Sequence, residues 1–243
     1  MMGGGNVEAL VPGREAPRRV RAAWATHKFE DVIAAIEAQP RSRQARRAKR
    51  VLDIVGSALG LVVVSPLLLV LALAVKLTSR GSIVFSQERC GLRGRPFRFY
   101  KFRTMVVDAE DRKRDLEHLN EMRGPVFKIR RDPRITGLGR VLRKLSLDEL
   151  PQLWNVLRGD MSLVGPRPPT PDEVVRYTPR QLQRLSVMPG ITGLWQVSGR
   201  NDIPDFERWI DLDLEYARTW SLWLDVRILL KTAIVVALLR GAQ

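Results

Sequence analysis

The chain has 243 residues, enough to bury the core of one domain with attached segments. Its 41 lysines and arginines against 26 aspartates and glutamates give a formal charge of +15, which predicts an anionic partner: nucleic acid, lipid head groups or a phosphorylated substrate. The hydrophobic fraction of 45% excludes a disordered chain, and the single cysteine, Cys90, excludes an internal disulfide framework.

The first 45 residues differ in composition from the rest of the chain. Glycine, proline and arginine dominate residues 1 to about 22, which predicts a mobile tail, and no apolar stretch with a small-residue cleavage site marks a signal peptide. Residues 24–38 carry apolar side chains at helical spacing, which predicts a short amphipathic helix on the domain or on a membrane surface. We assign residues 1–45 to an N-terminal tail with this short helix.

A long apolar segment follows, from Val51 to Val75, with Asp53 as its only charge. As a straight helix it would be roughly 37 Å long, enough to cross the hydrocarbon core of a bilayer. A buried core helix is the alternative, but a core helix of this length without a polar face is unusual in so small a domain. The segment therefore predicts an association with a membrane.

Two features of this segment favour a re-entrant helix over a kinked span. Basic residues flank it on both sides, and a straight span can place only one flank on the cytoplasmic side. Pro66 lacks an N–H and its ring clashes with the carbonyl of Val62, so the helix must kink or break there. The Ser65 hydroxyl can then serve a carbonyl freed by the break. We predict a re-entrant membrane helix hairpin over residues 46–78.

Residues 79–243 are assigned to a catalytic domain whose elements are shorter. The predicted strands are residues 82–87 and 96–105, and the predicted helices are residues 107–122, 146–157, 179–187, 206–224 and 226–239. The last helix is too short to span a membrane and, with the tryptophans before it, predicts an interfacial position. The predicted fold class is α+β and mainly helical: a membrane hairpin, a small cytoplasmic catalytic domain and amphipathic helices at the interface.

The adjacent carboxylates of Asp148 and Glu149 stand out within the run RVLRKLSLDELP. Ser146 and Glu149 match a capping box, which would make the acidic pair an ordinary helix start. Pro151 fits better if the helix begins at Leu147 or Asp148, because the first N–H groups of a helix need no partner. Carboxylates beside arginines stay ionised and can attack a phosphate, so this run also fits phosphoryl chemistry.

Several long motifs, in the same order, resemble the bacterial sugar transferase family of monotopic polyprenyl-phosphate hexose-1-phosphate transferases. The motifs are KRVLD with its Ser-Pro apolar segment, KFRTM at 101–105, LSLDELPQLWNVLRGDMSLVGPRP at 145–168 and PGITGLWQVSGRN at 189–201. The resemblance covers nearly everything from Lys49 to Arg240. It leaves out only the N-terminal segment.

The resemblance implies a role for each matching position. Asp148 would be the nucleophile that takes a sugar phosphate from a UDP-sugar and releases UMP, and Glu149 would help to hold Mg²⁺; both are also tentative metal ligands. Polyprenyl (undecaprenyl) phosphate would then accept the sugar phosphate. The implied substrate-binding residues are Lys101, Arg143, Arg167, Arg200 and Asp213. The implied membrane-anchoring residues are Lys49, Arg50, Asp53, Ser65 and Pro66.

Alternatives remain for single residues and for the whole chain. Asp213 could be a helix-surface carboxylate, and Arg167 a surface arginine. The charge permits a membrane-tethered nucleic-acid binder, although an acidic pair amid the arginines argues against nucleic acid as the partner. An inactive scaffold for polysaccharide assembly is a third hypothesis. The expected location is the cytoplasmic face of a bacterial inner membrane, in contact with phospholipids. The expected sugar is glucose or galactose, and a homodimer is left open.

Overall fold

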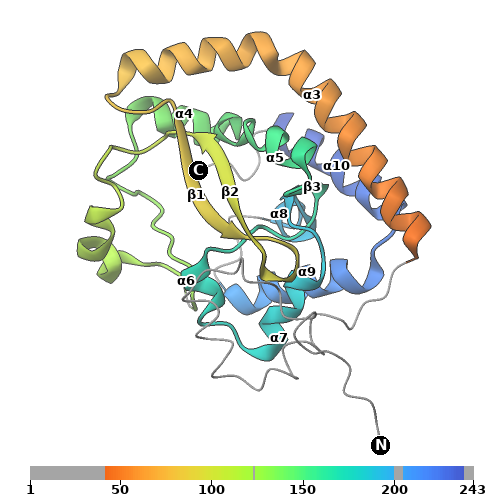
Figure 1. The fold of residues 1–243 in the computed structure, drawn as a ribbon. Coiled ribbons are helices and arrows are strands. Elements are labelled where there is room, and N and C mark those ends of the chain that lie inside the picture. The colour runs from red at the N-terminus through yellow and green to blue at the C-terminus, as the bar shows by residue number, and fades with distance from the viewer. Residues whose placement is uncertain (1–41, 123, 200–204, 238–243) are drawn as a thin grey trace, which may run out of the picture.

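The computed structural model describes residues 42–122, 124–199 and 205–237. The fold is mainly helical, and two small two-stranded sheets lie within these residues (Figure 1). This agrees with the predicted α+β class. The helix predicted at residues 24–38 lies outside the described residues.

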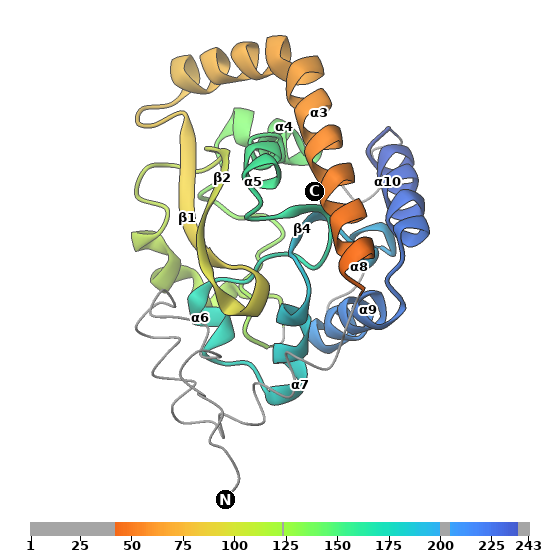
Figure 2. The same ribbon diagram turned by 45° about the vertical axis from the view of Figure 1, so that its right-hand side comes forward.

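The long apolar segment forms one helix, α3 (Arg43–Thr78), which starts before and ends after the predicted apolar run. Pro66 lies inside it, and the Ser65 hydroxyl donates a hydrogen bond of 2.8 Å to the carbonyl of Val62. Ser65 therefore satisfies the carbonyl that the proline ring displaces, as the sequence predicts. The helix bends partway along its length (Figures 1 and 2). The predicted hairpin is thus a single bent helix with two arms.

The outward surface of α3 is apolar and uncovered. Its most hydrophobic 18-residue window has a mean hydropathy of 2.8, and only 11% of that window is buried. Val62 and Val63, close to the bend, are 71% and 77% exposed. By length and composition α3 could cross a membrane. An uncovered apolar surface of this size is typical of a membrane-contacting element.

Polar side chains fix the N-terminal arm of α3 to the rest of the protein. The Lys49 ammonium lies 2.7 Å from the buried carboxylate of Asp225. Arg50 donates to the carbonyls of Val156 and Leu157, at 2.6 and 2.7 Å. The buried carboxylate of Asp53 accepts hydrogen bonds from the hydroxyl of Ser162 and the N–H of Leu163. Three of the five residues predicted as membrane anchors therefore connect this arm to the folded domain.

Apolar contacts fix the C-terminal arm of α3 to the same domain. Leu71 and Val75 are buried against Phe102 and Leu142. Each arm of the bent helix thus rests on the same folded domain, on either side of α5 (Gln152–Arg158) in Figure 2. Both ends of α3 are therefore held by the folded domain, and the apolar bend lies between them.

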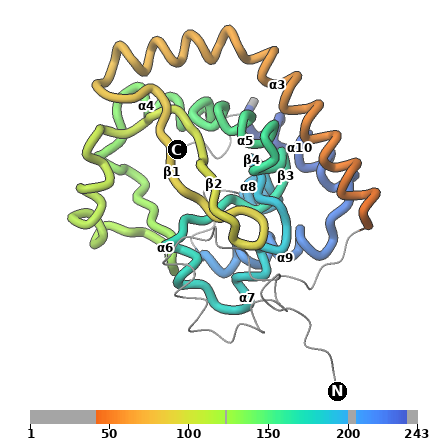
Figure 3. Tube along the Cα trace, viewed as in Figure 1, coloured from red at the N-terminus to blue at the C-terminus, as the bar shows by residue number. Residues whose placement is uncertain are grey.

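Both predicted strands form and pair with each other. β1 (Val84–Cys90) runs antiparallel to β2 (Pro96–Phe102), with Val84 opposite Phe102 and Cys90 opposite Pro96. β1 starts and ends later than predicted, because its pairing with β2 continues to Cys90. A second sheet pairs β3 (Ser162–Val164) with β4 (Gly190–Thr192) in parallel. The segment between β2 and α4 (Gly137–Lys144) lies on one side of the β1–β2 sheet, and α10 (Leu222–Ala237) lies on the other side (Figure 3).

The helices predicted at residues 107–122 and 206–224 differ from the structure. Residues 107–122 form turns and a 3₁₀ helix, Asp111–Leu119, because residues 111–119 are highly charged and bury no side chain that could hold an α-helix on the core. The predicted helix 206–224 is divided into α9 (Phe206–Thr219) and α10. The division falls where Trp220 leaves helical geometry and the hydroxyl of Ser221 accepts the N–H of Leu224 at the start of α10.

The remaining short helices surround these elements. They are α6 (Pro171–Val174), α7 (Pro179–Leu182) and α8 (Leu194–Val197), with a 3₁₀ turn at Gln183–Ser186 after α7. The main core lies between α9 and the segments around it, where the rings of Trp195 and Trp209 stack 4.4 Å apart. On α10, Trp223 and Ile234 are 66% and 57% exposed, while Ile228 is buried. The helix therefore presents apolar side chains on its exposed face, and its predicted interfacial position stays a prediction.

We expect Lys49→Ala to lower the free energy of unfolding by about 3 kcal/mol, because it leaves the carboxylate of Asp225 buried without its cation. For a chain of this size the change corresponds to a decrease in Tm of roughly 6–12 °C. Thermal unfolding in detergent micelles measures it. Arg112→Ala, which breaks the half-exposed Arg112–Asp108 pair, is the matched control and should change the stability by less than about 1 kcal/mol. Equal effects of the two substitutions would contradict the anchoring role of Lys49.

Candidate active site

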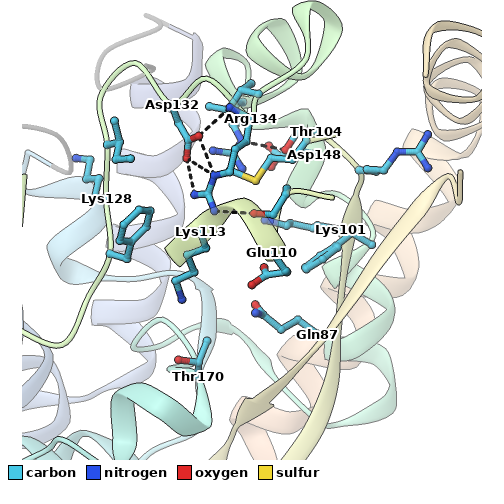
Figure 4. A pocket seen from close by; sticks show the side chains of 18 of the residues that line it. Gln87, Lys101, Thr104, Glu110, Lys113, Lys128, Asp132, Arg134, Asp148 and Thr170 are labelled. Atoms are coloured by element: carbon cyan, nitrogen blue, oxygen red, sulfur yellow. Dashed lines mark hydrogen bonds and ion pairs between the residues drawn. The ribbon is translucent and has the colours of Figure 1, made fainter. Parts of the chain in front are cut away.

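A pocket of about 950 Å³ lies between β1 and β2, the segment from Thr104 to Ile135, and the turn that carries Asp148 (Figure 4). Its lining includes Lys101, Arg143, Asp148 and Arg167, which the sequence predicts as site residues. Glu149 also lines it. The structure therefore brings together five predicted residues from four separate parts of the chain.

Asp148 lies in a 3₁₀ turn, Leu147–Glu149, between α4 and α5. Its side chain is buried, with 6% of its surface exposed. The turn follows Ser146, whose φ of 55° is left-handed and uncommon for a residue other than glycine. The capping box is wrong, since the Ser146 side chain makes no capping hydrogen bond. The predicted helix start is also one turn early, because α5 begins at Gln152, directly after Pro151.

A close backbone contact brings α4 to the end of β2. A Cβ atom on Gly139 would lie 2.1 Å from the carbonyl oxygen of Thr104, so only glycine allows this approach. The contact places Arg143, one turn further along α4, so that its Nε donates to the hydroxyl of Thr104 at 2.9 Å. Figure 4 shows Thr104 and Asp148 next to each other at one end of the pocket.

The charges around Asp148 are mostly positive and act on one another. Burial lowers the pKa of Arg143, and the carboxylate of Asp148 opposes this by stabilising the guanidinium. Burial and the nearby Arg143 lower the pKa of Lys101 to about 8, and Asp148 again acts in the opposite direction. Arg167 lowers the pKa of Lys101 and of Arg143 as well. The carboxylate of Asp148 thus lies within the field of a cationic cluster formed by Lys101, Arg143 and Arg167.

Such a cluster is suited to an anion with several charges. Burial is the main cause of the lowered pKa of Lys101, and repulsion from Arg143 and Arg167 adds to it, because three cations close together repel one another. A diphosphate would relieve this repulsion, and arginine guanidinium groups bind phosphate oxygens in pairs. The cluster therefore indicates a phosphate-binding site around a buried carboxylate.

Sequence reasoning missed several residues of the pocket. Arg89 is buried, stacks on the ring of Phe99 at 5.3 Å and donates to the carbonyl of Pro168. Burial, and next Arg167, lower its pKa to about 10. Nothing in the β1 sequence marks Arg89 as a pocket residue. Thr104 could have been found, because it belongs to the KFRTM motif that contains Lys101.

A second missed feature is the buried ion pair of Asp132 and Arg134 in the pocket wall. The Arg134 guanidinium lies 2.6 Å from the Asp132 carboxylate and also donates to the carbonyl of Ala109. This pair, seen at the top of Figure 4, fixes the segment between β2 and α4 along the pocket. Below this pair Figure 4 shows Glu110 and Gln87 in the middle of the pocket and Thr170 at its far end, and these side chains can hydrogen-bond hydroxyl groups.

Three groups of predicted residues lie elsewhere. Asp213 does not line the pocket; it is buried on α9, with its carboxylate 2.6 Å from Arg184. Arg200 lies outside the described residues. The predicted membrane anchors lie along α3. Among the predicted substrate-binding residues, the structure therefore places Lys101, Arg143 and Arg167 in the pocket and Asp213 outside it.

The described residues contain no cluster of three or more histidine, cysteine, aspartate or glutamate side chains that could hold a metal ion without help. Asp148 and Glu149 are adjacent carboxylates at the pocket. Mg²⁺ commonly binds to one or two protein carboxylates and completes its shell with waters and substrate phosphates. The two residues fit such a site in the presence of a phosphorylated ligand.

Comparisons with known proteins agree with the resemblance found in the sequence. Residues 44–239 match the model of a protein family described as bacterial sugar transferase. This range contains α3 from its second residue on, the pocket lining, and α9 and α10. It begins at residue 44, so residues 1–43 lie outside it.

Curated relatives are similar over about four fifths of the chain. The galactosyl transferase CpsE of Streptococcus agalactiae serotype III (strain NEM316) is 53% identical over 81% of this chain and 43% of its own length. The undecaprenyl-phosphate galactose phosphotransferase of Salmonella typhimurium is 45% identical over 82% of this chain and 42% of its own length. The exopolysaccharide production protein ExoY of Rhizobium meliloti is 42% identical, over 80% of this chain and 88% of its length. The chain spans about two fifths of the length of the first two relatives.

We expect inorganic pyrophosphate to bind to this pocket, with an association constant that falls as the pH rises through about 8, because Lys101 then loses its proton and its charge. Titration calorimetry between pH 6.5 and 9.5 measures this. Lys101→Met should bind pyrophosphate more weakly at pH 7 and should lose the decrease near pH 8. A decrease that persists unchanged in this variant would show that another group is responsible.

Proposed function

The chain belongs to the bacterial sugar transferase family, and we propose that it moves a hexose 1-phosphate from a UDP-sugar to polyprenyl (undecaprenyl) phosphate and releases UMP. The observation that carries this proposal is the buried carboxylate of Asp148 within the cluster of Lys101, Arg143 and Arg167. Relatives named as undecaprenyl-phosphate galactose and glucose phosphotransferases support the reaction class. The product would prime the synthesis of an exopolysaccharide or another glycoconjugate.

In the first step we propose that a carboxylate oxygen of Asp148 attacks the phosphorus that bears the sugar. A bond from this oxygen to phosphorus forms, and the bond from phosphorus to the oxygen bridging to UMP breaks, with its electron pair leaving on UMP. The result is an aspartyl-phosphosugar. Splitting one difficult transfer into two steps is the usual advantage of a covalent intermediate.

The cationic cluster would supply the electrostatic part of this step. Negative charge develops on the leaving UMP oxygen, and Lys101, Arg143 and Arg167 already lie around the carboxylate. Since these groups are held by the fold, they need no rearrangement when the charge develops. Thr104 and Gly139 contribute indirectly, because they position Arg143.

In the second step an oxygen of the polyprenyl phosphate attacks the same phosphorus. The bond between phosphorus and the Asp148 oxygen breaks, the carboxylate is regenerated, and a polyprenyl diphosphate sugar is formed. We propose that Glu149, together with Asp148, holds Mg²⁺ in the presence of the donor phosphates. The ion would neutralise phosphate charge there.

The bound sugar is proposed to be glucose or galactose. Relatives are named for each of the two, including a galactosyl transferase and an undecaprenyl-phosphate glucose phosphotransferase. The side chains that could bind its hydroxyl groups are Glu110 and Gln87 in the middle of the pocket and Thr170 at the end away from Asp148.

We further propose that α3 is a re-entrant helix that enters one leaflet of the bacterial inner membrane and returns, with the pocket on the cytoplasmic side. Support comes from the bend at the apolar middle of the helix and from its two arms, which are fixed to the same folded domain. A straight span would carry one arm away from that domain. In the re-entrant position the pocket lies next to the membrane, where the phosphate of a lipid acceptor is found.

We expect Asp148→Asn to abolish UMP release and transfer of radiolabelled sugar phosphate to membrane lipid, with a loss of at least about a thousandfold, because the amide cannot act as the nucleophile. Asp160→Asn is the control, since Asp160 lies outside the pocket lining, in a turn behind α5. Its activity should stay within a few-fold of that of the unchanged protein. Full activity of Asp148→Asn would refute the nucleophile assignment.

We expect single cysteines at the exposed positions Arg43, the first residue of α3, and Arg80, just after its end, to react with a membrane-impermeant maleimide from the same side of the membrane. Both Arg43→Cys and Arg80→Cys should be labelled in inside-out vesicles and neither in intact spheroplasts. The native Cys90 is buried and gives little background. Val63→Cys, close to the bend, should react only after solubilisation. Labelling of the two flanks from opposite sides would establish a span.

A further inference from the structure

The loop that carries Arg167 into the pocket is held by hydrogen-bond donors from other segments of the chain. Pro166, Pro168 and Pro169 lack an N–H, so the loop has few donors of its own. Each carbonyl from residue 166 to residue 169 accepts one hydrogen bond, from the N–H of Gly190, the side chain of Arg184, the side chain of Arg89 and the N–H of Cys90, in that order. The donors outside the loop therefore determine where Arg167 lies.

Arg184 is the donor to the carbonyl of Arg167 itself, at 3.1 Å. It lies in the 3₁₀ turn after α7, and only 4% of its surface is exposed. Its second terminal nitrogen donates to the hydroxyl of Tyr177 at 2.8 Å. The orientation of this guanidinium is thus fixed on one side by Tyr177 and on the other by the loop.

Asp213 completes this arrangement from the far side. Its carboxylate lies 2.6 Å from the same Arg184 nitrogen that donates to Arg167. Burial raises the pKa of Asp213 to about 6, and Arg184 acts to lower it, so the carboxylate is ionised at neutral pH. Asp213 is 1% exposed and does not line the pocket. It can therefore act on a ligand only through Arg184.

We propose that Asp213 is a positioning residue for the phosphate-binding cluster: it holds Arg184, Arg184 holds the carbonyl of Arg167, and Arg167 is thereby placed for the phosphates of the donor. The inference rests on the proposed function only in naming those phosphates as belonging to a UDP-sugar. A displacement of about 1 Å in a binding group is enough to cost a large factor in affinity or rate. The role of Asp213 therefore needs no contact with substrate.

The test is a double-mutant cycle with inorganic pyrophosphate as the ligand, measured by calorimetry at pH 7.5 in detergent micelles. Asp213→Asn should weaken pyrophosphate binding roughly tenfold in the otherwise unchanged protein. In the Arg167→Ala background it should change the binding by less than about twofold, because the group it positions is gone. An equal loss in both backgrounds would overturn the proposal.

Asp225→Asn is the matched control, since Asp225 is also a buried carboxylate with a basic partner and lies outside the pocket lining. Any effect of this substitution on binding should be the same in both backgrounds.

If Asp213→Asn does not fold, Arg184→Lys tests the same connection between Asp213 and Arg167. A lysine keeps a charge opposite Asp213 but cannot occupy both positions of the guanidinium fork, so it should show the same dependence on Arg167. Independence from Arg167 would again overturn the proposal.

Steady-state kinetics separate this inference from the proposed function. If the chain is the proposed transferase, Asp213→Asn should raise the KM for the UDP-sugar roughly tenfold and change kcat less. A decrease in kcat at unchanged KM, together with equal pyrophosphate losses in the cycle, would indicate a general loss of structure. If the unchanged protein releases no UMP from any UDP-sugar, the proposed function fails, and the pyrophosphate cycle still decides the role of Asp213.

Discussion

The attachment of α3 to the folded domain is the constraint on which the pocket depends. The N-terminal arm is fixed through Asp53 to the start of β3, and β3 leads directly into the loop with Arg167. The C-terminal arm packs on Phe102, which precedes the KFRTM residues Arg103 and Thr104, and on Leu142, which precedes Arg143. Each arm of the apolar helix thus supports one side of the cationic cluster. The contacts that hold the two arms of α3 on the folded domain thus also hold the segments that carry the cationic cluster.

Several buried charges in the described part of the protein are compensated in pairs, whereas the pocket carries an excess of cations. Lys49 with Asp225, Arg134 with Asp132, and Arg184 with Asp213 each join a cation to a carboxylate at 2.7 Å or less. A buried ion pair rarely adds much stability in itself, but the loss of one partner is costly, so such pairs fix the segments that carry them. In the pocket, cations outnumber carboxylates, and burial together with repulsion from Arg143 lowers the pKa of Lys101. An anionic ligand would neutralise these positive charges, as the carboxylate does in each of the three ion pairs.

Much of the organisation follows from local sequence, and the exceptions have local causes. Pro66, with the Ser65 hydroxyl beside it, determines a bend in any helix that contains them. The charged run 107–122 has helical composition but no apolar stripe for the core, so it forms turns and a 3₁₀ helix. The division between α9 and α10 depends on Trp220 and Ser221, whose neighbouring contacts end one helix and start the next. Composition averaged over a stretch of sequence does not detect such a helix cap.

By itself the sequence determined that the chain has an apolar, proline-bent helix, a mainly helical domain with a few strands, and an acidic pair among basic residues within recognisable family motifs. These are properties of short segments, and local periodicity and composition are sufficient to specify them. Only the tertiary structure decided which charged residues share the pocket. Arg89 and Arg134 lie in segments without any local signal, and Asp213, predicted to bind substrate, is buried against Arg184 instead. The physical reason is that the charge balance of a buried site is set by distances between segments far apart in the chain, which no single segment encodes.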